Sequence, residues 1–317
     1  MSISPETFPL LQQAVALRAR GRLTEAEHIA RAALHAAPGD AGARWVLGTV
    51  LLLQGRYGEG FELYEARHEW APIRVAKPQL PYPEWNGEPV KRLLVWIEQG
   101  FGDQIQMARF APMLAERMEV LWLCPPPLIR LFRQLPVTVI EQAPVISFDD
   151  PDAWVMPLGL PLRLGVSGPD DILSAPYFSA PSAPKLDGFN IGVCWRGNPQ
   201  HPNDARRSMP SPEPLRTLSK IGALHDFTEP QGDFLDAARR IGQMDAIVTV
   251  DTAVAHLAGA LGIPCFILLP AEDVDWRWSY GRDDTPWYRS VRLCRQAMPG
   301  DWASAVAAAA RRVARLR

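Results

Sequence analysis

Apolar residues in the first seventy positions recur at intervals of three or four, which predicts amphipathic helices rather than strands. Leu10, Ala14 and Leu17 would share the face of one helix, and Gly21 would end it. An alanine-rich face follows and stops at Pro38, since proline cannot continue a helix. The beginning of the chain is therefore predicted to be all α.

The same pattern returns after about 34 residues, the length of a tetratricopeptide unit of two antiparallel helices. Leu47 and Leu51 take the places of earlier apolar residues, and Gly55 takes the place of Gly21. Gly48 and Gly60 would let paired helices approach closely. We interpret residues 1–70 as two short tetratricopeptide-like repeats, with an ordinary pair of helical hairpins as the alternative.

After a proline-rich linker at residues 72–87, short apolar runs alternate with helical stretches. A second linker, rich in Pro, Ser and Ala, occupies residues 174–185. Alternating strands and helices predict parallel sheets joined by right-handed crossovers. The interruption indicates two sheets facing a cleft, one in residues 71–185 and one in residues 186–317. The predicted strands are 93–97, 120–123, 137–140, 153–156, 191–195, 246–250 and 265–269. The predicted helices are 103–116, 212–220, 233–241, 253–261 and 302–316.

Composition narrows the possible functions. The 317 residues carry 33 Lys and Arg against 35 Asp and Glu, so the formal net charge of −2 argues against nucleic-acid binding. The four cysteines are far apart and lack a metal-binding or redox spacing, and at least three are predicted to be buried in strands. The sequence shows neither a signal-type apolar core nor a run of membrane-spanning length, which predicts a cytoplasmic chain.

The first candidate corner for chemistry follows the strand at 93–97 and runs from Glu98 to Gln104. Gly100 and Gly102 would allow a tight turn, and Asp103 would stand at a helix start. Its carboxylate could point into the cleft or simply cap the helix. Ile105 stands where a dinucleotide-binding motif requires a third glycine, which disfavours a nicotinamide or flavin cofactor.

The second corner comprises Asp251 and Thr252 at the end of a strand, before a helix of small residues. Such a helix would lie close to the sheet and direct its free amides toward the cleft, where they could hold an anion. His256 would follow one turn later on the same face. Taken alone, His256 is better interpreted as a hydrogen-bonded core histidine.

Between the corners lies a polar loop that leaves the strand at 191–195. It contains Arg196, Asn198, Arg206, Arg207 and Ser208. Three arginines at a strand end favour an anionic ligand, because ligands of open parallel sheets bind beyond the carboxyl ends of the strands. A solvated surface loop is the alternative.

Later residues offer aromatic groups but no metal site. Trp276 and Trp278 could cover the mouth of the cleft, stack on a ligand, or be buried. Asp273 and Asp275 are two carboxylates without further ligands nearby, so no metal is predicted. The sequence also lacks a P-loop and a nucleophile elbow.

Taken together, four blocks resemble bacterial tetratricopeptide proteins fused to a glycosyltransferase-like domain of the two-Rossmann GT-B architecture, related to the lipopolysaccharide heptosyltransferases. The resemblance covers nearly the whole chain. The blocks are residues 98–106, 195–208, 250–259 and 275–278. It implies an α/β fold of two Rossmann-like domains, an acceptor domain at 71–185 and a nucleotide-sugar donor domain at 186–317, preceded by the repeats.

The resemblance also implies a role for individual residues. Asp103 would be the general base that deprotonates the acceptor hydroxyl, whereas Asp251 and Thr252 would hold the donor sugar and diphosphate. We add His256 and the loop of residues 196–208 to the donor side. Gln99, Gln104 and the two tryptophans are assigned to the acceptor side or a lid. The implied reaction moves a sugar from a nucleoside-diphosphate donor to a saccharide or protein acceptor, without metal or other cofactor.

One departure motivates a second hypothesis. Relatives of this type usually carry another strand, a phosphate-facing loop and a further helix between Ser208 and Asp251, where this chain is expected to be shorter, and Glu229 would repel a phosphate. The alternative is a degenerate transferase kept as a protein-binding module. A protein partner would then bind the helical repeats around Trp45 or Tyr64.

Overall fold

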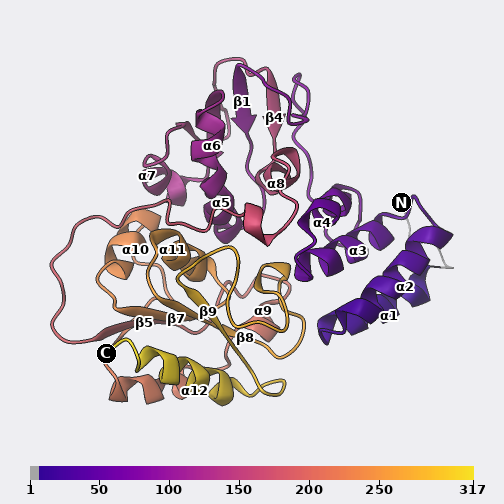
Figure 1. Cartoon of the computed structure of the whole chain (residues 1–317). Helices are drawn as coiled ribbons and strands as arrows, with labels where there is room; N and C mark the ends of the chain where they lie inside the picture. The colour runs from indigo at the N-terminus through magenta and orange to yellow at the C-terminus, as the bar shows by residue number, and fades with distance from the viewer. Residues whose placement is uncertain (1–6) are drawn as a thin grey trace. The chain divides into compact units, whose positions relative to one another are not determined.

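The computed structural model describes residues 7–317, which form two compact units. The first unit contains residues up to Pro81 together with Leu158–Ile172 and Glu272–Arg282. The second contains Tyr82–Pro157, Leu173–Ala271 and Asp283–Arg317. The first unit is helical, and the second carries all the strands (Figure 1).

Four helices open the first unit: α1 (Phe8–Ala19), α2 (Leu23–Ala36), α3 (Ala41–Leu53) and α4 (Tyr57–Tyr64). Gly21 and Gly55 follow α1 and α3 with φ of 71° and 80°, a left-handed conformation that suits glycine. The two predicted breaks are therefore confirmed. α1 and α3 begin at residues 8 and 41, and α2 and α4 begin at residues 23 and 57, so corresponding helices are about 34 residues apart. The tetratricopeptide assignment itself stays a prediction.

Two glycines bring α3 and α4 together. A Cβ carbon on Gly48 would lie 2.9 Å from the backbone nitrogen of Tyr64 and 3.1 Å from the carbonyl oxygen of Gly60. A Cβ carbon on Gly60 would lie 2.9 Å from Leu52. The predicted close approach is confirmed, because neither position has room for a larger side chain.

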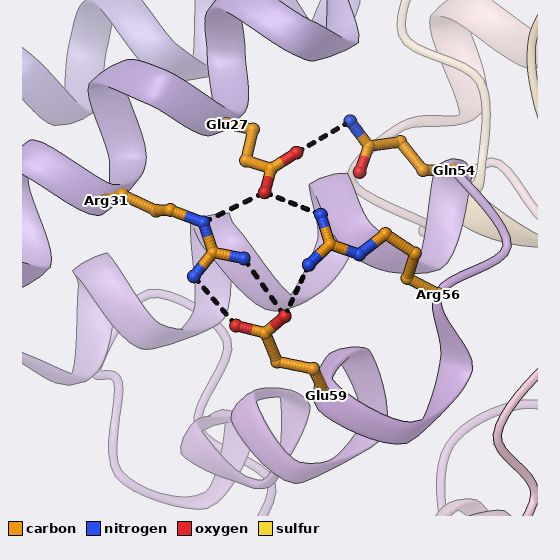
Figure 2. A network of polar contacts seen from close by, with 5 residues as sticks. All are labelled: Glu27, Arg31, Gln54, Arg56 and Glu59. Atoms are coloured by element: carbon orange, nitrogen blue, oxygen red, sulfur yellow. Dashed lines mark hydrogen bonds and ion pairs between the residues drawn. The ribbon is translucent and has the colours of Figure 1, made fainter.

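A closed ring of charges joins α2 to α4 (Figure 2). Arg31 bonds Glu27 at 2.8 Å and Glu59 at 2.7 and 2.9 Å. Arg56 bonds the same two carboxylates at 2.6 and 2.8 Å, and Gln54 donates to Glu27 at 3.0 Å. Two guanidinium groups thus balance two carboxylates at the edge of the helical unit.

Later segments of the chain complete the core of the first unit. The Trp276 ring packs edge-on against Phe61 at 5.5 Å and against Tyr64 at 6.1 Å. Helix α8 (Leu160–Arg163) contributes Arg163, which pairs with Glu65 at 3.0 Å. Tyr64 is only 6% exposed, because its ring packs inside the unit; the hypothesis of a protein-binding surface around Trp45 or Tyr64 stays a prediction.

The first sheet of the second unit is parallel and has the strand order β3-β2-β1-β4. Its strands are β1 (Arg92–Val95), β2 (Glu119–Cys124), β3 (Thr138–Glu141) and β4 (Ala153–Val155). β1 is buried along most of its length, as expected for a strand paired on both sides. The predicted helix at 103–116 is broken into α5 (Phe101–Met107), a 3₁₀ turn and α6 (Ala111–Ala115), with α7 (Ile129–Phe132) following β2.

The second sheet is also parallel, with the order β6-β5-β7-β8-β9. Its strands are β5 (Asn190–Cys194), β6 (Ala223–Asp226), β7 (Ala246–Val250), β8 (Cys265–Leu269) and β9 (Val291–Arg295). All four cysteines lie buried in strands, which confirms that prediction. The expectation that a strand is missing after Ser208 is wrong, because β6 pairs with β5 along four residues.

Helices cover both faces of this sheet (Figure 1). α10 (Phe234–Ile241) and α11 (Ala253–Leu261) lie on one face, and α12 (Trp302–Val313) lies on the other. The predicted helix at 212–220 is a 3₁₀ segment, Glu213–Lys220, which packs with α12 in the core of that face. Short α9 (Asp204–Arg207) interrupts the loop after β5.

Candidate functional site at the switch points of two parallel sheets

Both candidate corners stand where the strand order of a sheet reverses. In the second sheet, β5 leads to β6 on one side, whereas β7 to β9 extend on the other. In the first, β1 leads to β2 on one side and pairs with β4 on the other. Ligands of open α/β sheets bind beyond the carboxyl ends of strands at such switch points. The corners after β1, β5 and β7 all meet this condition.

The first corner is tightly wound. Gln99 is exposed and has φ of 55°, which is uncommon for a residue other than glycine. Half-buried Asp103 accepts the Gly100 N–H at 2.9 Å through Oδ2, so its carboxylate holds the start of α5. Gln104 is buried and donates to the carbonyl of Glu98 at 2.5 Å. Asp103 therefore caps its own helix through this bond, which is one of the two roles that the sequence left open for it.

The second corner is built around Thr252, which precedes α11 and has extended backbone angles. Its Oγ1 lies 3.2 Å from the hydroxyl of Thr249 and 3.8 Å from Sγ of Cys194 at the end of β5. These contacts tie the ends of β5 and β7 together at the switch point. Burial raises the pKa of the Cys194 thiol, so it is a neutral group beside the hydroxyls.

The two corners meet through Gly102 and His256. A Cβ carbon on Gly102 would lie 2.7 Å from Cδ2 and 3.4 Å from Nε2 of His256, and 3.6 Å from Cα of Ala253. His256 is 5% exposed, and its Nδ1 lies 2.8 Å from the hydroxyl of Tyr288. The starts of α5 and α11 thus lie close together, and the buried imidazole of His256 packs against Gly102.

The loop after β5 is held in a compact form. Ser208 accepts the Gly197 N–H at 2.8 Å and donates to Asp204 at 2.8 Å. Arg207 is half-buried and pairs with Asp204 at 3.3 Å. Nη2 of Arg207 would lie 2.9 Å from a Cβ carbon on Gly197, so its guanidinium sits directly beside the chain leaving β5.

The remaining predicted residues of this loop are exposed. Arg196 forms an ion pair with Glu229 and lies 4.9 Å from the ring centroid of Trp195. Asn198 accepts the Gln200 N–H at 3.0 Å and shapes a turn, and Arg206 lies on the outer side of α9. Of the three arginines, Arg207 is the one fixed next to the strand end.

Sequence reasoning missed Arg109, which is 1% exposed and surrounded by aromatic rings. Its guanidinium carbon lies 4.6 Å from the ring centroid of Tyr288, 5.1 Å from Trp287 and 5.2 Å from Tyr177. It also donates to the carbonyls of Trp287 and, at 3.0 Å, Leu173. No local pattern marks Arg109, since its partners come from segments far away in sequence.

Trp276 and Trp278 belong to the first unit and are 4% and 0% exposed. The sequence left a lid, a stacking surface and buried packing open for these tryptophans. Both side chains are buried in the first unit, where neither is accessible to a ligand. Asp273 pairs with Arg18 at 2.8 Å, and Asp275 pairs with Arg277 at 2.9 Å. Within residues 7–317, no three His, Cys, Asp or Glu side chains gather as a metal site would require.

Across the same described residues, none of the helices combines the length and apolar character needed to cross a membrane. No protein-family model matches the chain. Protein FlbA of Caulobacter vibrioides (strain ATCC 19089 / CIP 103742 / CB 15) is 26% identical over 313 residues, which cover 80% of this chain and 52% of FlbA. The chain thus spans about half the length of this curated relative.

Several solved structures show a slight likeness. Escherichia coli heptosyltransferase WaaC with ADP has a TM-score of 0.48 and 13% identity, covering 71% of this chain and 100% of WaaC. The iron-containing dodecameric glycosyltransferase TibC of enterotoxigenic E. coli H10407 has a TM-score of 0.46 and 10% identity, with coverage of 76% and 81%. The family 9 glycosyl transferase of Veillonella parvula DSM 2008 has a TM-score of 0.43 and 11% identity, covering 66% of this chain and 86% of that one. Because these TM-scores are all below 0.5, the likeness does not indicate the activity or the substrate of this chain.

Proposed function

We propose that the second unit is a metal-independent glycosyltransferase. It would move a sugar from a nucleoside-diphosphate donor to a hydroxyl group of a saccharide or protein acceptor. The observation that carries this proposal is the contact between Gly102 and His256. That contact brings the corner after β1 and the corner after β7 together, each at the switch point of its own sheet.

The donor would bind at the second sheet. The start of α11 offers the positive end of a helix dipole, which contributes about 0.3–1 kcal/mol toward an anion. Asp251 and Thr252 would hold the donor sugar and diphosphate, and Arg207 is fixed beside the end of β5. A hydrogen bond to a charged group contributes roughly 1.5–3 kcal/mol, so these groups together could stabilise a departing diphosphate.

The acceptor would approach the first corner, where Asp103 would act as general base. The bond from Gly100 to Oδ2 fixes the orientation of this carboxylate, which a base requires. A positioned base typically accelerates a reaction by about 10²–10⁴-fold. Gln99 and Gln104 belong to the same corner as Asp103 and would contribute to the acceptor side.

Nucleotide binding is the first test. Isothermal titration of the full chain with ADP, GDP and UDP, each in the presence of EDTA, should give binding of at least one nucleotide below millimolar concentration. Asp103→Asn should keep this affinity, since Asp103 lies outside the donor side. The absence of heat with all three nucleotides at millimolar concentration would contradict the proposal.

A second candidate function is a protein-binding module without transferase activity. Two contacts favour it: Asp103 holds its own helix, and Glu229 neutralises the exposed Arg196. In the helical unit, half-buried Trp45 packs against Trp70 with a centroid distance of 4.5 Å, and these rings would be the aromatic surface that a partner binds. In a complemented deletion strain, Asp103→Asn would then preserve function and Trp45→Ala would abolish it; the opposite result would reject this candidate.

A further inference from the structure

Arg109 carries a buried positive charge that no carboxylate of the described residues neutralises. It is 1% exposed and forms no ion pair with any residue in 7–317. It donates instead to the backbone carbonyl groups of Gln106, Leu173 and Trp287. Taking a guanidinium group out of water is costly unless its donors are satisfied. The folded state is therefore favoured only while these carbonyl groups stay in place around the guanidinium.

Two tyrosines stacked on Arg109 are also attached to α11. The guanidinium carbon lies 4.6 Å from the ring centroid of Tyr288 and 5.2 Å from that of Tyr177. The Tyr288 ring packs so tightly on α11 that a Cβ carbon on Gly259 would lie 2.5 Å from it. The Tyr177 N–H donates to the carbonyl of Ala260 at 3.0 Å. Since Arg109 lies in the 3₁₀ turn that follows α5, it connects α5 with α11 through these two residues.

Arg109 is thus a second point of attachment between α5 and α11. The first is Gly102 at the start of α5, which packs against His256. The two points are seven residues apart in the sequence, which is about two helical turns. One contact would leave the two helices free to rotate about it, whereas two contacts along the same helix fix their mutual orientation. Because Asp103 follows Gly102, the orientation of α5 also sets the direction of its carboxylate.

Two further contacts join the same parts of the unit at its surface. Arg130 of α7 pairs with Asp233 at the start of α10 at 3.0 Å, but its side chain is 49% exposed. Exposed ion pairs contribute little to stability, because water and salt screen them. The Phe101 ring meets Phe234 of α10 and is itself 40% exposed. The buried attachment through the guanidinium therefore constrains the orientation more strongly than these contacts do.

From this geometry we infer that Arg109 is a positioning residue: its guanidinium fixes the orientation of α5 against α11, and with it the direction of the Asp103 carboxylate. Arginine suits this task because its planar group presents five N–H donors, which can bond carbonyl groups of several segments at once. The use of this orientation in catalysis rests on the proposed transferase function. The orientation itself is a property of the folded chain without a ligand.

The distance between two spin labels, measured by electron paramagnetic resonance on the full chain without nucleotide, tests this inference. Glu116→Cys places one label at the end of α6, and Arg239→Cys places the other on α10, which packs beside α11. Both positions are exposed. The four native cysteines are buried, and burial raises the pKa of the Cys124 thiol to about 12, so they should not react with the label. The parent should show a single narrow distance distribution.

Arg109→Met keeps most of the length of the side chain but removes its charge and its donors. This variant should unfold cooperatively on heating, as the parent does, yet lose the single narrow distribution. Arg133→Met removes an exposed arginine of the same unit and is the matched control, which should keep the parental distribution. If Arg109→Met does not fold, Arg109→Gln, which retains an amide donor, takes its place.

A folded Arg109 variant with the parental distribution would overturn the inference, and so would an equal loss in Arg133→Met. Because no nucleotide is present, either result is distinguishable from a failure of the proposed function, which is measured by nucleotide titration.

Discussion

Gly102 of α5 lies so close to the His256 ring of α11 that an added methyl group would stand 2.7 Å from its Cδ2. The imidazole cannot retreat easily, because Tyr288 holds its other edge and the residue is buried. The contact between the two corners therefore requires glycine at position 102, because a larger residue would collide with the imidazole. Several consequences of the site geometry can be measured.

Gly102→Ala should destabilise the second unit. Overpacking a buried contact typically costs about 1–3 kcal/mol, which exceeds the gain of about 1 kcal/mol from replacing glycine by alanine in a helix. Urea denaturation would measure the loss. Gly168→Ala is the control, since a Cβ carbon there meets no atom within 4 Å; equal stability of the two variants would show that the α5 start can move.

Gln99→Gly should stabilise the chain slightly. The left-handed conformation at φ of 55° costs a residue with a side chain about 1–2 kcal/mol, whereas glycine adopts it freely at an entropic cost of about 0.5–1 kcal/mol. We expect a gain of up to about 1 kcal/mol in thermal or urea unfolding. Gln99→Val, with a β-branched side chain, should change stability in the opposite direction.

Arg207→Ala should weaken binding of the nucleoside diphosphate at least tenfold. The loss of a charge-assisted hydrogen bond, roughly 1.5–3 kcal/mol, corresponds to about tenfold or more in the dissociation constant. Titration calorimetry with the nucleotide that binds the parent chain measures this. Arg216→Ala removes an exposed arginine of the same unit that pairs with Glu213, and unchanged affinity is expected there; a similar effect of both variants would indicate only a general charge effect.

Glu229→Gln should strengthen nucleotide binding, because it releases Arg196 from its ion pair and removes a negative charge near the strand end. An exposed pair contributes about 0.2–1 kcal/mol, so the expected gain is at most about fivefold. Glu213→Gln, which removes a distant carboxylate, serves as the comparison. A weaker affinity after Glu229→Gln would mean that Glu229 itself contacts the ligand.

Glu59→Gln should reduce the acid sensitivity of the helical unit. Hydrogen bonds from Arg31 lower the pKa of Glu59 below its ordinary value of 4.5. Burial acts against Glu27, but bonds from Arg31, Gln54 and Arg56 lower its pKa as well. Unfolding raises these values again, so the stabilisation is present above about pH 4.5 and is lost as the pH falls through the folded values.

Melting temperatures recorded between about pH 3 and pH 6 would show this effect as a shallower slope for Glu59→Gln than for the parent. Glu62→Gln, on the same helix but outside the ring of Figure 2, should retain the parental slope. Identical slopes for all three proteins would show that the ring contributes nothing to acid stability.

Seven strands could be predicted because each contains a short apolar run; most of them are buried parallel strands, whereas β3 is an edge strand with exposed ends. β6 and β9 were not predicted, since both are edge strands. β6 carries His225 and Asp226, and β9 carries Arg292 and Arg295, so neither has the apolar run of a central strand. Pro112 similarly explains why the helix predicted at 103–116 is interrupted.

The candidate site was predictable only in part. Turn glycines and strand-end polar residues identify the corners at Gly102 and Thr252, because those signals are local. The burial of Arg109 and Tyr288 beside His256 depends on contacts between distant segments, which no local pattern contains. The same holds for Trp276, whose neighbours in the structure are helices from the start of the chain.

The first unit takes its core from three stretches that lie far apart in the sequence. During synthesis, Phe61 and Tyr64 leave the ribosome roughly two hundred residues before Trp276, their packing partner. Until then these aromatic side chains lack the partner that covers them in the finished unit. A fragment cut after Pro81 would carry the same exposed surface permanently, so its aggregation would say nothing about the stability of the intact protein.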